Sequence, residues 1–183
     1  RTQRRIEGFL TRVPTPLLEE GCFRWSGHDR LHRPVLRING CLWQPGRFEP
    51  EEEEAFATLM LDYVEEQLPG SPCEEYRDGT PSGENWVVFF DMTGWTRANS
   101  DIATIKRLIG LMVNHYPERL GIALIYNAPF LFNALWMVVG PFLEARTRAK
   151  VRFLRRSSPG APSADLTDII AMEELDEEYG GYH

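Results

Sequence analysis

Residues 120–143 contain no charged side chain, and this segment constrains the fold more than any other part of the chain. A helix that spans a bilayer needs about 20 apolar residues, so the segment is long enough to be one. However, Asn127, Pro129 and Pro141 interrupt it, and the sequence Asn-Ala-Pro is typical of a turn. We therefore predict no membrane span but two elements, a buried strand over 120–126 and a helix with Pro129 at its first position.

The helix predicted after Pro129 is apolar on every side. A helix of this kind is either buried on both faces or in contact with lipid. In a chain of 183 residues a doubly buried helix is difficult to build, so we expect an apolar body next to it. The residues that make it apolar are Phe130, Leu131, Phe132, Leu135, Trp136, Met137, Val138 and Val139.

The segments on both sides of this helix alternate between strand and helix patterns. Residues 86–90 form a continuous apolar run, typical of a strand covered on both faces. Residues 102–113 carry an amphipathic stripe, for which Ser100 is the predicted cap. A further strand is expected over 150–154. The alternation over 86–154 predicts an α/β fold with a mostly parallel sheet.

The remaining elements are shorter or less regular. Pro14 and Pro16 mark a connector, so residues 1–18 are predicted to be the remnant of a preceding helical region with its linker, and residues 19–183 to be one domain. Further predicted elements are strands over 23–27 and 33–39, a helix over 50–68, and a short helix over 165–171 capped by Asp165.

Charge and cysteine content exclude several classes of protein. The formal net charge of −7 argues against a general nucleic-acid-binding protein. The three cysteines are far apart and form no Cys-x-x-Cys pair, which predicts no metal site and a reducing, cytoplasmic setting. The basic segment 146–156 indicates either contact with a membrane surface or a solvated edge strand protected by cations.

No catalytic motif is present, and neither a Walker loop nor a Gly-x-Ser-x-Gly or Gly-x-Gly-x-x-Gly sequence occurs. His115 and Glu118 are close enough in sequence to form an acid–base pair. Because His115 ends a predicted helix, where a cation is favourable, we interpret it as structural. Asp91 follows a buried strand and is interpreted as the cap of the next turn. We therefore predict that the protein is not an enzyme.

Three motifs in the second half of the chain carry a family resemblance. They are His-Tyr-Pro-Glu-Arg-Leu-Gly at 115–121, Ile-Tyr-Asn-Ala-Pro-Phe-Leu-Phe at 125–132, and Pro-Phe-Leu at 141–143. Together they resemble the CRAL-TRIO lipid-binding domain family, and in particular the yeast-type phosphatidylinositol/phosphatidylcholine transfer proteins. The resemblance covers most of residues 22–181. One departure is Leu31-His32, which replaces the glycine usual before Arg-Pro-Val.

The resemblance implies that the sheet is the floor of an apolar pocket and that the uncharged helix is the gate that closes it. Exchange of a ligand would then require the gate to move, with Gly140 as its hinge and Pro141 setting the bend. The residues expected to line the acyl pocket or form the gate are Phe130, Phe132, Leu135, Trp136, Val139 and Phe142.

The resemblance also implies a headgroup site, with Glu118, Thr147 and Lys150 in the positions that contact inositol phosphate. A carboxylate can accept hydrogen bonds from ring hydroxyls, while an ammonium and a hydroxyl can hold phosphate. The alternative is an ordinary ion pair between Glu118 and Lys150. Thr96 falls where a hydroxyl near the lipid phosphate is expected. Tyr63 is a looser match, which core packing explains as well.

These observations predict binding and transfer of a phospholipid, with phosphatidylinositol favoured, by a cytoplasmic protein that contacts membranes peripherally. The ligand is the lipid itself, and no cofactor or nucleic acid is expected. Two alternatives remain open. One is a carrier of a sterol, a terpene or a fat-soluble vitamin, and the other is a membrane-recruitment or regulatory module that uses residues 146–156.

Overall fold

The computed structural model describes residues 17, 19–68, 82–156 and 163–182. The predicted remnant over 1–18 lies outside the described residues except for Leu17, whose side chain is buried. Cys73 also lies outside them. The domain boundary expected after residue 18 therefore stays a prediction.

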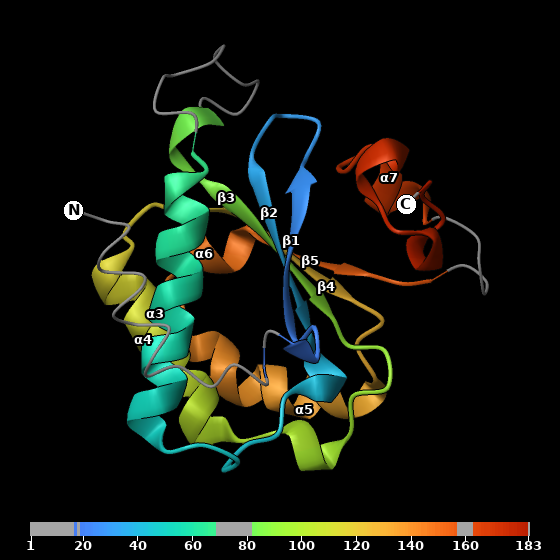
Figure 1. The fold of residues 1–183 in the computed structure, drawn as a ribbon. Helices are drawn as coiled ribbons and strands as arrows, with labels where there is room; N and C mark the ends of the chain where they lie inside the picture. The colour runs from blue at the N-terminus through green and yellow to red at the C-terminus, as the bar shows by residue number, and fades with distance from the viewer. Residues whose placement is uncertain (1–16, 18, 69–81, 157–162, 183) are drawn as a thin grey trace.

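A five-stranded sheet forms the centre of the fold, with its strands in sequence order (Figure 1). The first pair of strands is antiparallel, and the other three pairs are parallel, which confirms the predicted α/β fold. The strands are β1 (Phe23–His28), β2 (Pro34–Asn39), β3 (Trp86–Asp91), β4 (Leu120–Tyr126) and β5 (Val151–Leu154).

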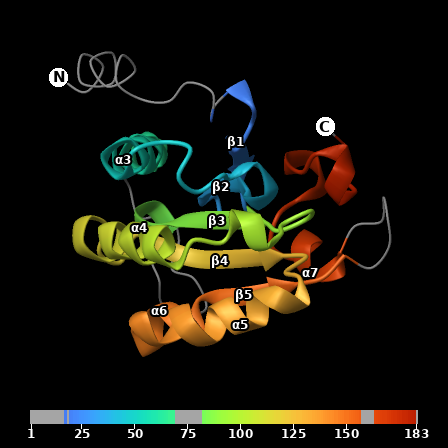
Figure 2. The same ribbon diagram turned by 90° about the horizontal axis from the view of Figure 1, so that it is seen from below.

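Helices cover one face of the sheet and the C-terminal segment covers the other (Figure 2). The helices α3 and α4 lie side by side on the first face, and α5 and α6 continue this layer next to β5. On the opposite face α7 and the turns after it pack against the sheet. The helices are α3 (Pro50–Glu66), α4 (Ile102–His115), α5 (Phe130–Val139), α6 (Ala145–Ala149) and α7 (Ala164–Thr167).

The helix ends follow local capping chemistry, with two corrections to the sequence predictions. Asp101, not Ser100, caps α4, because its carboxylate accepts a hydrogen bond from the Ala103 amide at 2.9 Å. The Ser100 hydroxyl instead donates to the Arg97 carbonyl and closes the preceding turn. The last predicted helix is also shorter than expected and ends at Thr167; Ser163, not Asp165, stands at its N-cap, and Asp165 lies in its first turn.

The early end of α7 has a long-range cause. The carbonyl oxygen of Thr167 accepts a hydrogen bond from the Arg30 side chain at 2.8 Å, and the carbonyl of Ile169 accepts one from the Arg30 amide at 2.8 Å. Arg30 lies in the turn between β1 and β2. The chain therefore leaves the helix in order to pair with this turn, which local sequence does not reveal.

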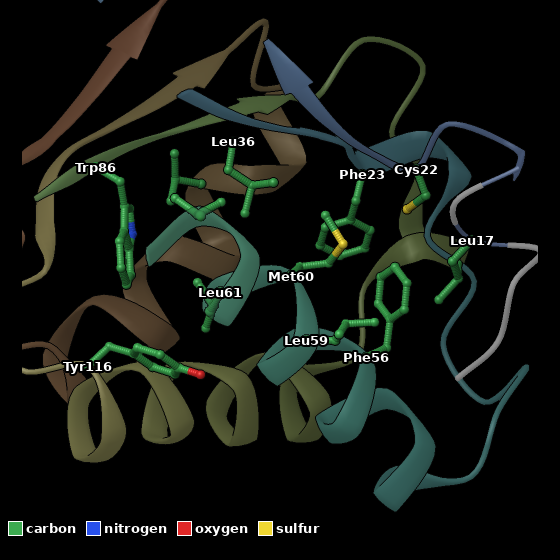
Figure 3. Close-up of a cluster of buried hydrophobic side chains, with 12 residues drawn as sticks. Leu17, Cys22, Phe23, Leu36, Phe56, Leu59, Met60, Leu61, Trp86 and Tyr116 are labelled. Atoms are coloured by element: carbon green, nitrogen blue, oxygen red, sulfur yellow. The ribbon is translucent and has the colours of Figure 1, made fainter. Parts of the chain in front are cut away.

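One cluster of buried side chains holds α3 to the sheet (Figure 3). Phe23 of β1 points toward Phe56 of α3, and their ring centroids lie 4.8 Å apart in an edge-to-face contact. Trp86 of β3 meets Tyr116, at the end of α4, in the same way, with 5.7 Å between centroids. Aromatic pairs of this geometry stabilise a core beyond the area that they bury.

The uncharged segment 120–143 divides as predicted. β4 ends at Tyr126, a turn contains Asn127 with a φ of 54°, and α5 follows directly after Pro129. Among the described residues, no helix is both long enough and apolar enough to cross a membrane.

Candidate functional site: an apolar cavity with one charged end

A cavity of about 450 Å³ lies between the sheet and the helices α3, α4 and α5. Its floor is one face of β2, β3, β4 and β5. Its walls are almost entirely apolar, and its charged side chains gather where β4 begins and α6 ends. The floor residues are Leu36, Ile38, Val88, Phe90, Ala123, Ile125 and Val151.

The two faces of the sheet differ in how tightly they are packed. On the face toward the C-terminal segment, Val87 and Leu124 have no exposed surface. On the cavity face, Phe90 and Ala123 are only half-buried although they lie in the same two strands, and Val151 of β5 is half-buried as well. Since protein interiors are normally close-packed, this difference identifies a hollow and not a solid second core.

The burial of residues in α4 also indicates a hollow. Its apolar stripe is regular, yet Thr104 is its only fully buried residue. Ile105, Ile109 and Met112 line the cavity and remain half-buried. An amphipathic helix in a closed core would bury this stripe completely. The stripe therefore faces empty space.

The inner face of α5 roofs the cavity. Phe132, Leu135, Trp136 and Val139 all line it, which is where the acyl-pocket prediction placed them. Their spacing of i, i+3, i+4 and i+7 puts them on one side of the helix. The predicted hinge at Gly140 begins a short 3₁₀ turn, Gly140–Phe142, directly after α5 ends.

The outer face of α5 is equally apolar but points into solvent. Phe130 is 91% exposed and Met137 is 78% exposed. Phe142, in the turn after the helix, is 58% exposed, and the Lys106 ammonium lies 4.0 Å from the centre of its ring. Phe130 and Phe142 were expected in the acyl pocket or gate, and the structure places both on the outside of the gate.

The charged end of the cavity brings together the three predicted headgroup residues. Glu118, Thr147 and Lys150 all line it, together with Arg146. The Lys150 ammonium lies 3.7 Å from one carboxylate oxygen of Glu118 and donates a hydrogen bond to the Leu120 carbonyl at 2.7 Å. The Arg146 guanidinium lies 3.1 Å from the other carboxylate oxygen of Glu118.

Backbone strain accompanies the position of Glu118. This residue has a φ of 60°, a left-handed conformation that is unfavourable for any residue with a side chain. Strain of this kind concentrates at functional sites, where the surrounding structure maintains it. It indicates that the surrounding structure holds the Glu118 carboxylate opposite α6.

Thr96 and Tyr63 do not join this group. The Thr96 hydroxyl donates to the Asn99 amide oxygen at 2.9 Å and accepts from the Ala98 amide, so it caps a 3₁₀ turn. Tyr63 lies on α3, where its ring meets Trp25 edge to face with 6.4 Å between centroids. Neither residue is among those that line the cavity.

Asp91, which was considered for catalysis, has structural surroundings. One Asp91 carboxylate oxygen accepts from the Thr93 amide at 2.8 Å, which is the turn cap that the sequence suggested. The other accepts from the Tyr179 hydroxyl at 2.6 Å. Burial, together with this bond to Asp91, raises the pKa of Tyr179. In the part of the chain that the structure describes, no group of His, Cys, Asp and Glu side chains is arranged to hold a metal ion.

Arg146 and Asn99 are polar residues at the cavity to which the sequence assigned no role there. Arg146 was part of the basic segment 146–156, although it stands four residues before Lys150 and so lies on the same side of α6. Asn99 also lines the cavity, where its amide donates to the carbonyls of Cys41 and Trp43. The Asn99 amide oxygen also accepts from the Thr96 amide and hydroxyl, a capping pair that is local in sequence, whereas both carbonyl partners are more than 50 residues away.

Comparisons with known proteins agree with this architecture. A family model for the CRAL/TRIO domain matches residues 18–181. The chain is 35% identical over 164 residues to the phosphatidylinositol transfer protein CSR1 of Eremothecium gossypii, and this covers 90% of the chain. It is 30% identical over 193 residues to the protein real-time of Aedes aegypti, covering 99% of the chain.

The chain spans about a third of the length of these relatives, 34% of CSR1 and 29% of real-time. The solved structure of Sfh5 has a TM-score of 0.62 to this chain at 17% identity, covering 82% of this chain and 55% of Sfh5. That likeness shows the fold, and the family match extends over nearly the whole chain. The chain belongs to the CRAL/TRIO domain family, a family of lipid-binding and lipid-transfer proteins.

Proposed function

We propose that this domain binds a phospholipid, with phosphatidylinositol favoured, and exchanges it between membranes. The observation that carries the proposal is the apolar cavity whose single charged end holds Glu118, Thr147 and Lys150. Hydrocarbon would occupy the apolar part. The headgroup would lie at the charged end, where Lys150 and Thr147 offer donors to phosphate and Glu118 accepts from hydroxyls.

The cavity volume indicates how a two-chain lipid would fit. A methylene group needs roughly the space of a water molecule in the liquid, about 30 Å³, so 450 Å³ holds about 15 of them. This is the length of one acyl chain. A second chain requires the roof formed by α5 to move outward, as a gate does.

Energetics favour exchange at a membrane surface. Exposing about 15 methylene groups to water costs about 12 kcal/mol, at about 0.8 kcal/mol each. Moving the same chain from a bilayer into an apolar cavity exchanges one hydrocarbon environment for another and costs little. The gate is therefore expected to open while α5 touches the bilayer, so that the chain never enters water.

The outer face of α5 provides a surface for that contact. Exposed apolar side chains gather on and next to this helix, and larger patches of this kind are typical of interaction sites. The Lys106 ammonium, which lies against the ring of Phe142, would favour an anionic membrane surface. The exposed apolar residues are Phe130, Leu131, Met137, Val138, Phe142 and Phe153.

A smaller hydrophobic ligand is the second candidate, because a terpene of about 15 carbon atoms fits a cavity of about 450 Å³ without movement of α5. The charged end would then contribute little to binding. Replacing Glu118 or Lys150 by alanine would leave the loading of such a ligand unchanged, whereas it would reduce the loading of a phospholipid.

A transfer assay between vesicles tests the leading proposal. Glu118→Ala should lower the transfer of phosphatidylinositol more than that of phosphatidylcholine, because only the former supplies ring hydroxyls to this carboxylate. Equal loss of both activities would remove the headgroup assignment. Binding to anionic vesicles in a co-sedimentation assay without any lipid transfer would instead identify a membrane-recruitment module.

A further inference from the structure

The geometry of α6 separates its two arginines. Successive residues of a helix are about 100° apart around its axis. Arg146, Thr147 and Lys150 therefore project within about 100° of one another, and all three line the cavity. Arg148 is about 200° from Arg146 and is exposed. Arg146 thus shares a face with the predicted headgroup residues, and Arg148 does not.

Arg146 and Lys150 flank the same carboxylate. Arg146 contacts Oε1 of Glu118 at 3.1 Å, and Lys150 lies 3.7 Å from Oε2. Lys150 is 19% exposed and is also fixed by the Leu120 carbonyl. Arg146 is 70% exposed. Among the described residues, Glu118 is the only hydrogen-bonding partner that the structure shows for its guanidinium.

The contact with Glu118 uses one of the five N–H donors of the guanidinium. The others remain available at the mouth of the charged end. Arginine binds phosphate oxygens with two parallel hydrogen bonds. The planar guanidinium of Arg146 can form them while one of its edges contacts the Glu118 carboxylate. Exposed ion pairs are weak, so the guanidinium can reorient toward a phosphate at little cost.

We infer that Arg146 is a fourth headgroup residue, which binds the phosphate ester of the ligand together with Lys150 and makes the site select anionic over zwitterionic headgroups. This role rests on the proposed function, and it makes Arg146 a determinant of which headgroups the same site selects. The three groups in direct contact carry two positive charges and one negative charge. A choline group would bring a further positive charge and no N–H or O–H donor for Glu118. Glu144, the other carboxylate that lines the cavity, is exposed and precedes α6.

The test is competitive loading. Delipidated protein is incubated with vesicles of equal phosphatidylinositol and phosphatidylcholine content, re-isolated, and its bound lipids are quantified by mass spectrometry. Arg146→Ala should lower the bound phosphatidylinositol:phosphatidylcholine ratio about three- to tenfold, as expected for one exposed charge-assisted contact. Arg148→Ala, the matched control on the opposite face, should leave the ratio unchanged, and Arg146→Lys should give an intermediate value.

The outcomes separate this role from the proposed function. If wild-type protein loads no phospholipid, the proposed function itself fails. If it loads phosphatidylinositol but Arg146→Ala leaves the ratio unchanged, or raises it, the role of Arg146 is overturned while the proposed function stands. Thermal melts of the two alanine variants verify that both are folded.

A second arm distinguishes a lipid headgroup from a free phosphate ester. The loading is repeated with excess glycerophosphoinositol, which carries the same headgroup without acyl chains. Unchanged lipid loading supports a lipid ligand, since the chains supply most of the binding free energy. Complete displacement of the lipid would overturn the assignment of Arg146 to a lipid headgroup.

Discussion

A bulky substitution on the cavity floor distinguishes a cavity that binds lipid from an ordinary close-packed core. Ala123 lies at the centre of the floor, paired with Val88 on β3 and Val151 on β5, and all three line the cavity. Ala123→Phe adds six carbon atoms, which take more than a third of the space for about 15 methylene-sized groups. We expect the loading of phospholipid to fall by more than tenfold.

The same substitution should change stability only slightly. Burying a phenyl ring contributes about 1.5–3 kcal/mol, and strain from a larger side chain costs about 1–3 kcal/mol, so the two effects nearly cancel. The free energy of unfolding of delipidated protein is expected to change by less than about 1 kcal/mol, or about 2–4 °C in melting temperature. Delipidated protein is required because a bound ligand stabilises the folded state.

The assay pairs lipid loading with urea unfolding. Ala103→Phe is the matched control, because Ala103 is exposed in the first turn of α4 and the same ring there leaves the cavity empty. Wild-type loading in Ala123→Phe would refute the reasoning. So would a loss of stability of about 3 kcal/mol or more, since that is the cost of forcing a ring into a close-packed interior.

Two further predictions concern the folded state itself. His32 is exposed with a φ of 56°, at the position where the family usually has glycine, so His32→Gly should raise the free energy of unfolding by about 0.5–1 kcal/mol. An unchanged or lower unfolding midpoint in urea would contradict this. Burial raises the pKa of the Cys22 thiol from 9.0 to about 12, which favours the protonated form in the folded state. The contribution of this thiol to the free energy of unfolding should therefore be fully present below about pH 9 and be lost as the pH rises toward 12. Urea titrations at about pH 8 and pH 10.5 should show a smaller loss of stability in Cys22→Ala than in the wild type. An identical alkaline loss in the variant would show that Cys22 does not cause it.

The sequence predicted the sheet and its helices because their signals are local. Asn-Ala-Pro at 127–129 separates β4 from α5, and Pro50 with the glutamates after it begins α3. The cap of α4 could not be assigned in the same way. Ser100 and Asp101 are adjacent and both favour caps, and only the turn that occupies the Ser100 hydroxyl decides between them.

Local sequence signals also decided which residues of the candidate site could be predicted. Glu118, Thr147 and Lys150 were predicted through motifs that surround them, and the structure brings them together. Thr96 is held by Asn99, three residues away in a local capping pair, whereas Tyr63 contacts Trp25 of another segment, which no local pattern reveals.

The existence of a cavity was predictable, but its size was not. The helix after Pro129 is apolar on every side, which predicted an apolar body next to it, and the family resemblance implied a pocket. The volume depends on how side chains from the five strands and from α3, α4, α5 and α6 meet, and the sequence does not specify that packing.

The central claim is that the cavity beneath α5 holds the hydrocarbon of a phospholipid. Native mass spectrometry of protein purified without detergent tests it most directly. We expect one phospholipid for each chain, with phosphatidylinositol as the main species after gas-phase release. A spectrum that shows only the mass of the bare chain, after purification from cells rich in this lipid, would contradict the claim.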